Sequence, residues 1–291
     1  MTQLAFDNFS RGHPRAVLGE SACWDPATNA IWWVDIDGRR LLRTDTGSGE
    51  TASWETPEIP GFVALIGADA PVVGMESGIH AFAPASAAYE RLVAIDRPGC
   101  RFNDAIVDPL GRLWASTMPL VAEAGRGAIH LVLPDRTLRT FVEGLTIPNG
   151  IALDLERGRF LHSDSHRDVQ TIWVTPLDGE ALPTGEATPF ASTVSLPGRP
   201  YGASLDADGN YWIAGVDGSE LYVFDLAGEV QARVAVPSVA PTKICFCGSD
   251  GRTAIVTSKD IGEQGGYLAR ARLPPAMPAG TVQPYWKTAA S

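Results

Sequence analysis

The sequence predicts an all-β protein, a six-bladed β-propeller with a central channel that folds as one domain over residues 1–291. Three observations lead to this fold class. Short runs of aromatic and β-branched residues alternate with Asp/Gly turns, this strand–turn–strand pattern recurs at a nearly constant spacing, and no long amphipathic helix interrupts it. A repeat that contains only strands is typical of a propeller, in which every blade is a four-stranded antiparallel sheet.

The repeat is clearest in the turns, because Asp and Gly tolerate the backbone conformations that tight turns require. Four segments show the pattern strongly, at residues 21–34, 105–115, 151–161 and 203–213, and two diverged copies lie at 65–73 and 244–256. Their turn aspartates are Asp25, Asp69, Asp108, Asp154, Asp206 and Asp250. The steps of 44, 39, 46, 52 and 44 residues fit one blade per repeat. A pair of β-sandwiches is the alternative fold, but it gives no reason for a fixed period.

Composition and charge exclude several classes of protein. The chain has 45% hydrophobic residues, which excludes disorder, and 23 basic against 34 acidic residues, which gives a net charge of −11. Such an acidic surface repels phosphate backbones and anionic lipids, so we expect no nucleic-acid and no membrane partner. No apolar run approaches the length of a membrane helix, and residues 1–15 do not resemble a signal peptide. The four cysteines lack metal-site spacing, so we expect buried, reduced thiols in a cytoplasmic protein.

Four residues share one position in four different repeats. Counting back five residues from the turn aspartates at 25, 108, 154 and 206 gives Glu20, Asn103, Asn149 and Tyr201. In a propeller the first strand of each blade lines the channel, so we expect these side chains to converge at one end of it. One carboxylate and two amides are oxygen donors that suit a hard divalent cation. The alternative is that these residues satisfy backbone groups at the strand ends.

Several short motifs, taken together and in order, resemble the SMP-30/gluconolactonase/regucalcin family over about residues 15–270. They are Leu18-Gly19-Glu20, Arg101-Phe102-Asn103-Asp104, residues 107–112, Thr117-Met118, Pro148-Asn149-Gly150, Ser163-Asp164-Ser165, Pro241-Thr242-Lys243 and Val256-Thr257-Ser258. The resemblance implies a six-bladed propeller that binds one divalent metal ion and hydrolyses a sugar lactone to the sugar acid. It implies Ca²⁺ first, with Mg²⁺, Mn²⁺, Zn²⁺ or Fe²⁺ as alternatives, and a cytoplasmic monomer or weak homo-oligomer.

The same resemblance implies roles for individual residues. Glu20 and Asn149 match metal ligands, and Arg101 and Asn103 match residues that hold the substrate, with Asn103 also close enough to reach the metal. Glu123, on an expected lid loop at residues 121–127, corresponds to a further substrate contact.

Tyr201 departs from the family pattern, which usually reads Pro-Asp-Gly where this chain reads Pro200-Tyr201-Gly202. The aspartate of the family is both a metal ligand and the expected base. A neutral phenol is a poor substitute in either role unless a nearby cation lowers its pKa. Tyr201 is therefore either an ionised catalytic group or a wall of a changed pocket.

Other readings of the function stay open beside lactone hydrolysis. They are a non-catalytic propeller that binds a small molecule and a hydrolase of another ester, organophosphates included. The segment His162–His166 contains Ser, His and Asp, but neighbouring strand residues point to opposite faces and cannot form a catalytic triad with one another. Trp114 and Trp212 follow equivalent turns, which indicates packing rather than ligand stacking.

Overall fold

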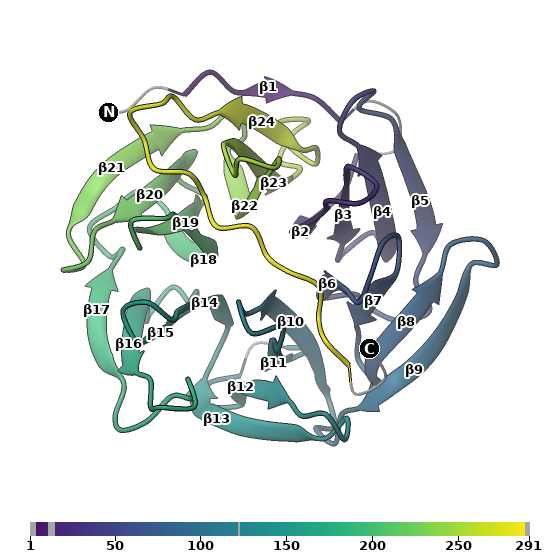
Figure 1. Ribbon diagram of the computed structural model, residues 1–291, viewed down its shortest axis with the longest axis horizontal. Coiled ribbons are helices and arrows are strands. Elements are labelled where there is room, and N and C mark those ends of the chain that lie inside the picture. Colours follow the sequence, from purple (N-terminus) through teal and green to yellow (C-terminus); the bar gives the residue numbers. More distant parts are fainter. Residues whose placement is uncertain (1–3, 11–14, 122, 289–291) are drawn as a thin grey trace. The chain divides into compact units, whose positions relative to one another are not determined.

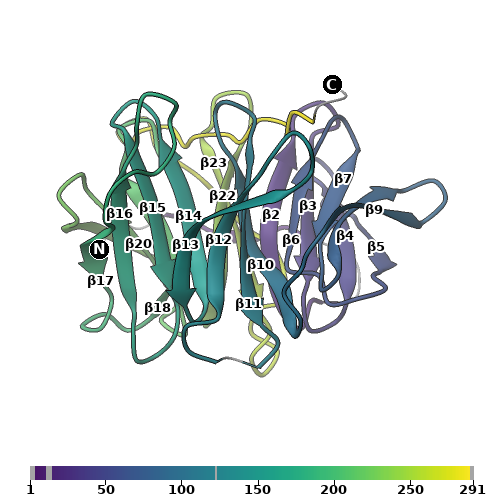
Figure 2. The same cartoon turned by 90° about the horizontal axis from the view of Figure 1, so that it is seen from below.

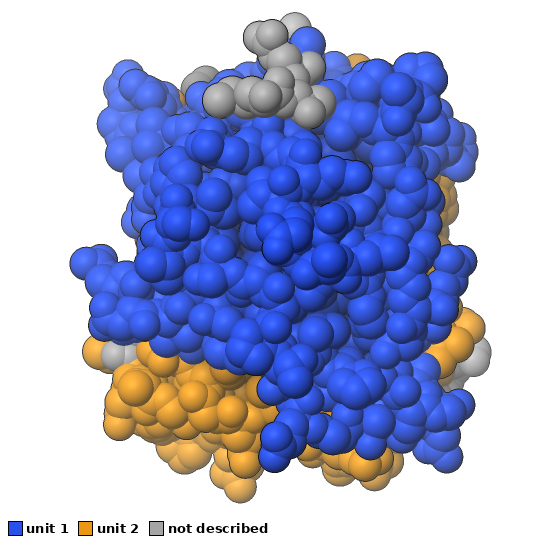
Figure 3. Space-filling view, turned by 90° about the vertical axis from the view of Figure 1, so that its left-hand side faces the viewer, with its two compact units in different colours: residues 1–9, 149–282 blue, residues 10–148, 283–291 orange. Residues whose placement is uncertain are grey.

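The computed structural model describes residues 4–10, 15–121 and 123–288, and within these ranges every regular element is a β-strand (Figure 1). The all-β prediction is therefore confirmed. None of the described segments forms a helix long and apolar enough to cross a membrane. The internal contacts gather into two compact units, residues 1–9 with 149–282 (unit 1) and residues 10–148 with 283–291 (unit 2), which Figure 3 shows in different colours. That the whole chain forms one domain stays a prediction.

Unit 2 contains three four-stranded antiparallel sheets, counted over its described residues. The first consists of β2 (Gly19–Asp25), β3 (Ala30–Asp35), β4 (Arg40–Asp45) and β5 (Thr51–Glu55). The second consists of β6 (Phe62–Leu65), β7 (Pro71–Gly74), β8 (Gly78–Ala83) and β9 (Ala88–Ala94). The third consists of β10 (Cys100–Val107), β11 (Leu113–Pro119), β12 (Gly127–Val132) and β13 (Leu138–Leu145).

Unit 1 repeats the same pattern, and Figure 2 shows β14, β15 and β16 side by side. Its first sheet consists of β14 (Pro148–Asp154), β15 (Arg159–Asp164), β16 (Thr171–Pro176) and β17 (Thr188–Ser192). The next four strands are β18 (Arg199–Leu205), β19 (Tyr211–Val216), β20 (Glu220–Phe224) and β21 (Val230–Ala235). The last group contains β22 (Ala240–Cys247), β23 (Thr253–Lys259), β24 (Ala269–Arg272) and the N-terminal β1 (Asp7–Asn8), which pairs with β24.

This succession of four-stranded groups confirms the β-propeller architecture, with one difference in the blade count. The expected six separate blades appear as six four-stranded groups but only five sheets over the described ranges. The reason is one parallel pair between Gly202 of β18 and Lys243 of β22, which joins the last two groups into a single eight-stranded sheet.

The turn aspartates explain why the hairpins form. Asp108 accepts hydrogen bonds from the backbone N–H groups of Leu110 and Arg112, both at 2.9 Å, and from the indole N–H of Trp114 at 3.0 Å. The equivalent aspartate of a later repeat, Asp206, accepts one from the indole of Trp212 at 2.9 Å. Both tryptophans are fully buried, so the prediction that they serve packing is confirmed.

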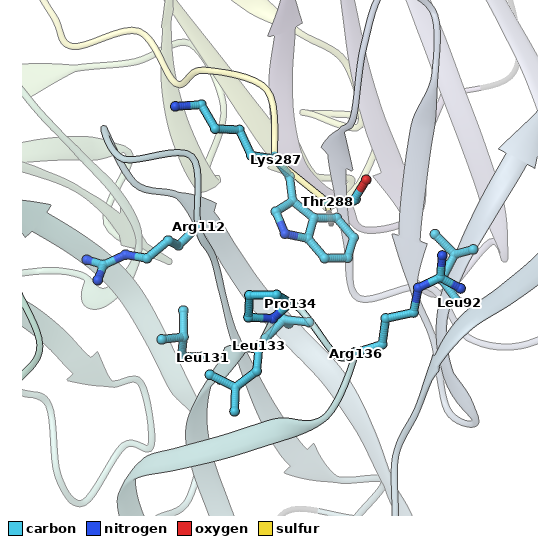
Figure 4. A pocket seen from close by; sticks show the side chains of 10 residues that line it. Leu92, Arg112, Leu131, Leu133, Pro134, Arg136, Lys287 and Thr288 are labelled. Atoms are coloured by element: carbon cyan, nitrogen blue, oxygen red, sulfur yellow. The ribbon is translucent and has the colours of Figure 1, made fainter. Parts of the chain in front are cut away.

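The cores lie between neighbouring four-stranded groups of each unit, and the four cysteines are buried and free, as expected. In unit 2 the C-terminal segment completes the core. Trp286 is buried in the cluster that contains Phe62 and Phe102, and its backbone N–H donates to Leu65 O at 2.7 Å. Beside the indole lies a cavity of about 100 Å³, whose wall contains Pro134 (Figure 4). None of the predicted site residues lines this cavity among the residues described.

Candidate functional site

The first strand of four repeats carries a β-bulge at the height of the predicted site. In β2 three residue steps, from Glu20 to Cys23, span two steps on the partner strand. The same irregularity lies between Phe102 and Ala105 in β10, between Pro200 and Ala203 in β18, and between Pro241 and Lys243 in β22. Bulges re-aim side chains and are frequent next to active sites. Asn103 and Tyr201 lie within their bulges, and Glu20 is the last paired residue before its own.

Glu20 is a buried carboxylate in unit 2. Its Oε2 accepts a hydrogen bond from the N–H of Ser21 at 2.6 Å, and Ser21 adopts a left-handed backbone conformation with φ of 54°. The hydroxyl of Ser21 in turn accepts the N–H of Val63 at 3.1 Å, which ties the bulge of β2 to the neighbouring β6. The bulge therefore holds the carboxylate in a defined place inside the protein.

Arg101 and Asn103 form one polar arrangement on β10, also in unit 2. Arg101 Nη1 donates to Asn103 Oδ1 and to Phe102 O, both at 2.8 Å. Asn103 Nδ2 donates to Pro148 O at 3.0 Å. Because a carbonyl can only accept, this contact fixes which end of the Asn103 amide is the nitrogen. The amide oxygen therefore accepts a hydrogen bond from the guanidinium of Arg101.

Glu123 lies on the exposed loop between β11 and β12, with 64% of its side chain exposed. It forms an ion pair with Arg126 at 3.1 Å, and this carboxylate raises the pKa of Arg126. Arg126 also donates to Pro98 O at 2.9 Å, so the loop is tied to the segment that leads into β10 and Arg101. Ala122 of the expected lid lies outside the described residues.

Asn149 is buried on β14 in unit 1, and a serine fixes its orientation. Asn149 Nδ2 donates to Ser165 Oγ at 2.8 Å, and Ser165 Oγ donates to Pro200 O at 2.6 Å. Since the hydroxyl has one proton and gives it to Pro200, it can only accept from Asn149. The atom facing Ser165 is therefore the amide nitrogen, and the amide oxygen lies on the other side.

Tyr201 is partly buried on β18, which belongs to unit 1, as does Asn149 on β14. Its ring packs against the apolar cluster that contains Trp212 and Phe246. Strand β14 lies close to β18 at Gly150. A Cβ atom on this glycine would lie 3.0 Å from Tyr201 O and 2.3 Å from the Tyr211 hydroxyl. Gly150 also has φ of 62°, so both the lack of space for a Cβ and the left-handed backbone favour glycine at this position.

Lys243 belongs to the Pro241-Thr242-Lys243 motif, from which no role was predicted for it. It is 1% exposed on β22 and forms the parallel pair with Gly202, the residue after Tyr201. The sequence does contain a signal for its burial. The lysine directly precedes the apolar run Ile244 to Cys247 within one strand, and lysine is rare in such buried strands.

The Ser, His and Asp residues of β15 do not form a catalytic triad. His162 stacks on Trp173, with ring centroids 5.5 Å apart, and burial lowers its pKa to about 4. The Ser163 hydroxyl is buried and has no hydrogen-bond partner among the described residues. Asp164 accepts the backbone N–H of His166 at 2.9 Å, in the manner of a turn cap.

The structure thus gathers the predicted residues into two groups, one in each unit. Unit 2 holds Glu20, Arg101, Asn103 and Glu123, and unit 1 holds Asn149 and Tyr201 together with Lys243. Convergence of the two groups on one metal ion stays a prediction. In the part of the chain that is described, no three His, Cys, Asp or Glu residues form a group able to hold a metal. A metal at Glu20 would therefore depend on amide oxygens.

Comparison with known proteins places this arrangement in context. A family model for the SMP-30/gluconolactonase/LRE-like region matches residues 18–260. The 6-deoxy-6-sulfogluconolactonase of Pseudomonas putida is 31% identical over 246 residues, 84% of each chain. The pentonolactonase XacC of Haloferax volcanii is 30% identical over 243 residues, 83% of this chain and 81% of the relative. The crystal structure of a calcium-binding protein, regucalcin, from Agrobacterium tumefaciens has a TM-score of 0.88, at 26% identity over 99% of both chains.

Proposed function

The chain belongs to the SMP-30/gluconolactonase/LRE-like family, and from this premise we propose that it hydrolyses the ring ester of sugar lactones to the sugar acid. Two relatives of about 30% identity over most of the chain are named for the opening of sugar lactones, which supports this reaction. The observation that carries the proposal is the set of bulged first strands, on which Glu20, Asn103 and Tyr201 lie at or within the bulge, with Arg101 two residues before Asn103 on the same strand. No redox cofactor is needed for such an ester hydrolysis.

We propose that Glu20, Asn103 and Asn149 hold one divalent cation, Ca²⁺ first. The donor chemistry fits, because a buried carboxylate and two amides whose nitrogens are held by Pro148 and Ser165 supply oxygen atoms. When bound, the cation would act as a Lewis acid toward the lactone carbonyl. A regucalcin of this family is described as calcium-binding, which supports the choice of ion.

The remaining steps fall to the side chains of this protein. The guanidinium of Arg101, held by Phe102 O and Asn103 Oδ1, orients the hydroxyl groups of the sugar with a fixed fork of donors. Glu123 contacts the substrate from its loop. Water attacks the carbonyl carbon, the tetrahedral intermediate collapses with cleavage of the ring C–O bond, and the ring oxygen leaves as a hydroxyl group.

Two roles for Tyr201 remain, a wall of the pocket or an ionised phenolate that accepts the proton of the attacking water. Packing of the ring against the Trp212 cluster supports the wall. Because Tyr201 stands where the family usually has Asp, a second function is also considered, that of a propeller that binds a sugar acid or lactone without hydrolysing it.

A panel of aldonolactones, read by proton release with and without a chelator, tests the proposal. We expect at least one pentono- or hexonolactone to be opened well above the spontaneous rate, and the chelator to remove this activity. Activity that survives the chelator would contradict the metal assignment alone. No turnover of any lactone, with binding of the same compounds by calorimetry, would favour the non-catalytic alternative.

A further inference from the structure

The cavity beside Trp286 in unit 2 stands apart from the residues proposed for the lactone site. Its volume is about 100 Å³, and its wall is built from strand β9, from β12 with the turn that follows it, and from the C-terminal segment (Figure 4). Segments that are far apart in the sequence therefore meet around one small space.

Most of the wall is apolar. It contains the indole of Trp286 and the side chains of Leu131, Leu133 and Pro134, together with Leu92 of β9. Water finds few hydrogen-bond partners in such a space, whereas an engineered apolar cavity of about 150 Å³ holds benzene. By the same measure, a cavity of about 100 Å³ accommodates about four carbon atoms of an aliphatic chain.

The charged part of the wall is cationic. Arg112, Arg136 and Lys287 line the cavity, and no Asp or Glu does so among the residues described. This reverses the balance of a chain whose net charge is −11. Arg112 is already neutralised, because its Nε donates to Asp108 at 2.6 Å, and the stem of Lys287 packs over Gly111. The lining therefore favours a ligand that combines an apolar chain with a negative charge.

Arg136 is the cation that such a ligand can use. The turn between β12 and β13 holds it in a left-handed conformation, with φ of 68° and its backbone N–H donating to Leu133 O at 2.8 Å. Its guanidinium has no hydrogen-bond or ion-pair partner in the described part of the chain. The carboxylate of the neighbouring Asp135 instead accepts the N–H and the hydroxyl of Thr137, at 3.0 and 2.6 Å. A guanidinium can bind a carboxylate with two parallel hydrogen bonds.

We infer that this cavity binds a short-chain aliphatic carboxylate. The chain of about four carbons lies against Trp286, Leu131 and Leu133, and the carboxylate pairs with Arg136. Removal of the apolar chain from water supplies part of the affinity, and the charge-assisted hydrogen bonds fix the orientation. The inference does not depend on the lactone reaction, because none of the residues proposed for that reaction takes part.

Isothermal titration with three ligands tests both halves of the inference. Pentanoate has a four-carbon chain and a carboxylate, 1-pentanol has the same chain without the charge, and acetate has the charge without the chain. We expect pentanoate to bind at least about tenfold more tightly than 1-pentanol, and acetate to show no binding over the same concentrations. Equal affinity for pentanoate and 1-pentanol, or for pentanoate and acetate, would overturn the inference, as would a wild type that does not bind pentanoate.

Arg136→Gln removes the positive charge and keeps a polar side chain. The pentanoate affinity should fall about tenfold, with little change for 1-pentanol. Arg139→Gln is the matched control, because Arg139 is also exposed but has its guanidinium over the ring of Phe141, at 4.6 Å from the centroid, and does not line the cavity. An unchanged pentanoate affinity in Arg136→Gln, or an equal loss in Arg139→Gln, would contradict the proposed site.

Leu133→Trp tests the cavity by filling it. The larger side chain should abolish the binding of both pentanoate and 1-pentanol, and circular dichroism establishes that the variant is folded. Pentanoate should also raise the melting temperature of the wild type, because it binds the folded state alone, and should not raise that of Leu133→Trp. Pentanoate binding that survives in folded Leu133→Trp would place the ligand elsewhere and overturn the inference. Should this variant not fold, the comparison of Arg136→Gln with Arg139→Gln still decides.

Discussion

The serine that orients Asn149 offers the sharpest test of the proposed metal site. Ser165→Ala removes one buried hydroxyl and with it two hydrogen bonds, the 2.8 Å bond from Asn149 Nδ2 and the 2.6 Å bond to Pro200 O. Ser165 is fully buried, so water cannot replace the hydroxyl from the surface. The amide of Asn149 then loses the contact that fixes which of its two ends is the oxygen.

Ser165 has two roles, to pair buried polar groups and to orient the amide of Asn149. The first affects stability and the second affects metal affinity and activity, so measuring both separates the two roles. Leaving a buried donor and a buried acceptor unpaired costs about 1–3 kcal/mol of unfolding free energy for each of the two groups. For a chain of this length each kcal/mol lowers the melting temperature by roughly 2–4 °C. Loss of a partner that orients a metal ligand typically costs 10–100-fold in metal affinity or activity.

Ser163→Ala is the matched control, because Ser163 lies on the same segment and its hydroxyl is buried without a hydrogen-bond partner among the described residues. Its removal should leave stability and activity close to the wild type. Calorimetric melting, Ca²⁺ titration and proton release from an aldonolactone measure the three quantities. A Ser165→Ala variant that melts lower but keeps full Ca²⁺ affinity and turnover would refute the role of Asn149 as a ligand.

Four further outcomes are expected. Glu20→Gln removes the one carboxylate of the proposed set and should abolish Ca²⁺ binding in calorimetry; unchanged affinity would contradict the site. Arg101→Lys loses the planar fork that contacts Phe102 and Asn103, so turnover should fall at least tenfold at an unchanged melting temperature, whereas a normal rate would place Arg101 outside the site. If Tyr201 is a wall, Tyr201→Asp should tighten Ca²⁺ binding and Tyr201→Phe should keep most turnover; loss of turnover in the latter would favour the phenolate. Burial lowers the pKa of His162 to about 4, so the unfolded chain binds its proton first, and unfolding free energy in urea should decrease as the pH falls from about 6.5 toward 4. Burial lowers the pKa of His130 to about 4 as well, so His162→Phe should reduce that slope without abolishing it, and an equal slope in the variant would rule out a contribution of His162.

The sequence by itself determined the fold class, and it predicted the height of the candidate site within each repeat. Both are local properties. A turn aspartate such as Asp108 captures the N–H groups of the residues that follow it, so the hairpin and its spacing are encoded within a few positions. The distance of five residues from each turn aspartate then selects Glu20, Asn103, Asn149 and Tyr201, and this distance does not depend on contacts with distant parts of the chain.

Only the tertiary structure decided how these residues are held. The orientation of the Asn149 amide depends on Ser165, sixteen positions away, and that of Asn103 depends on Pro148, forty-five positions away. The joining of two groups into one sheet depends on a single parallel pair between Gly202 and Lys243. A spacing rule cannot foresee such contacts, because hydrogen-bond partners and burial are set by segments that meet only when the chain has folded.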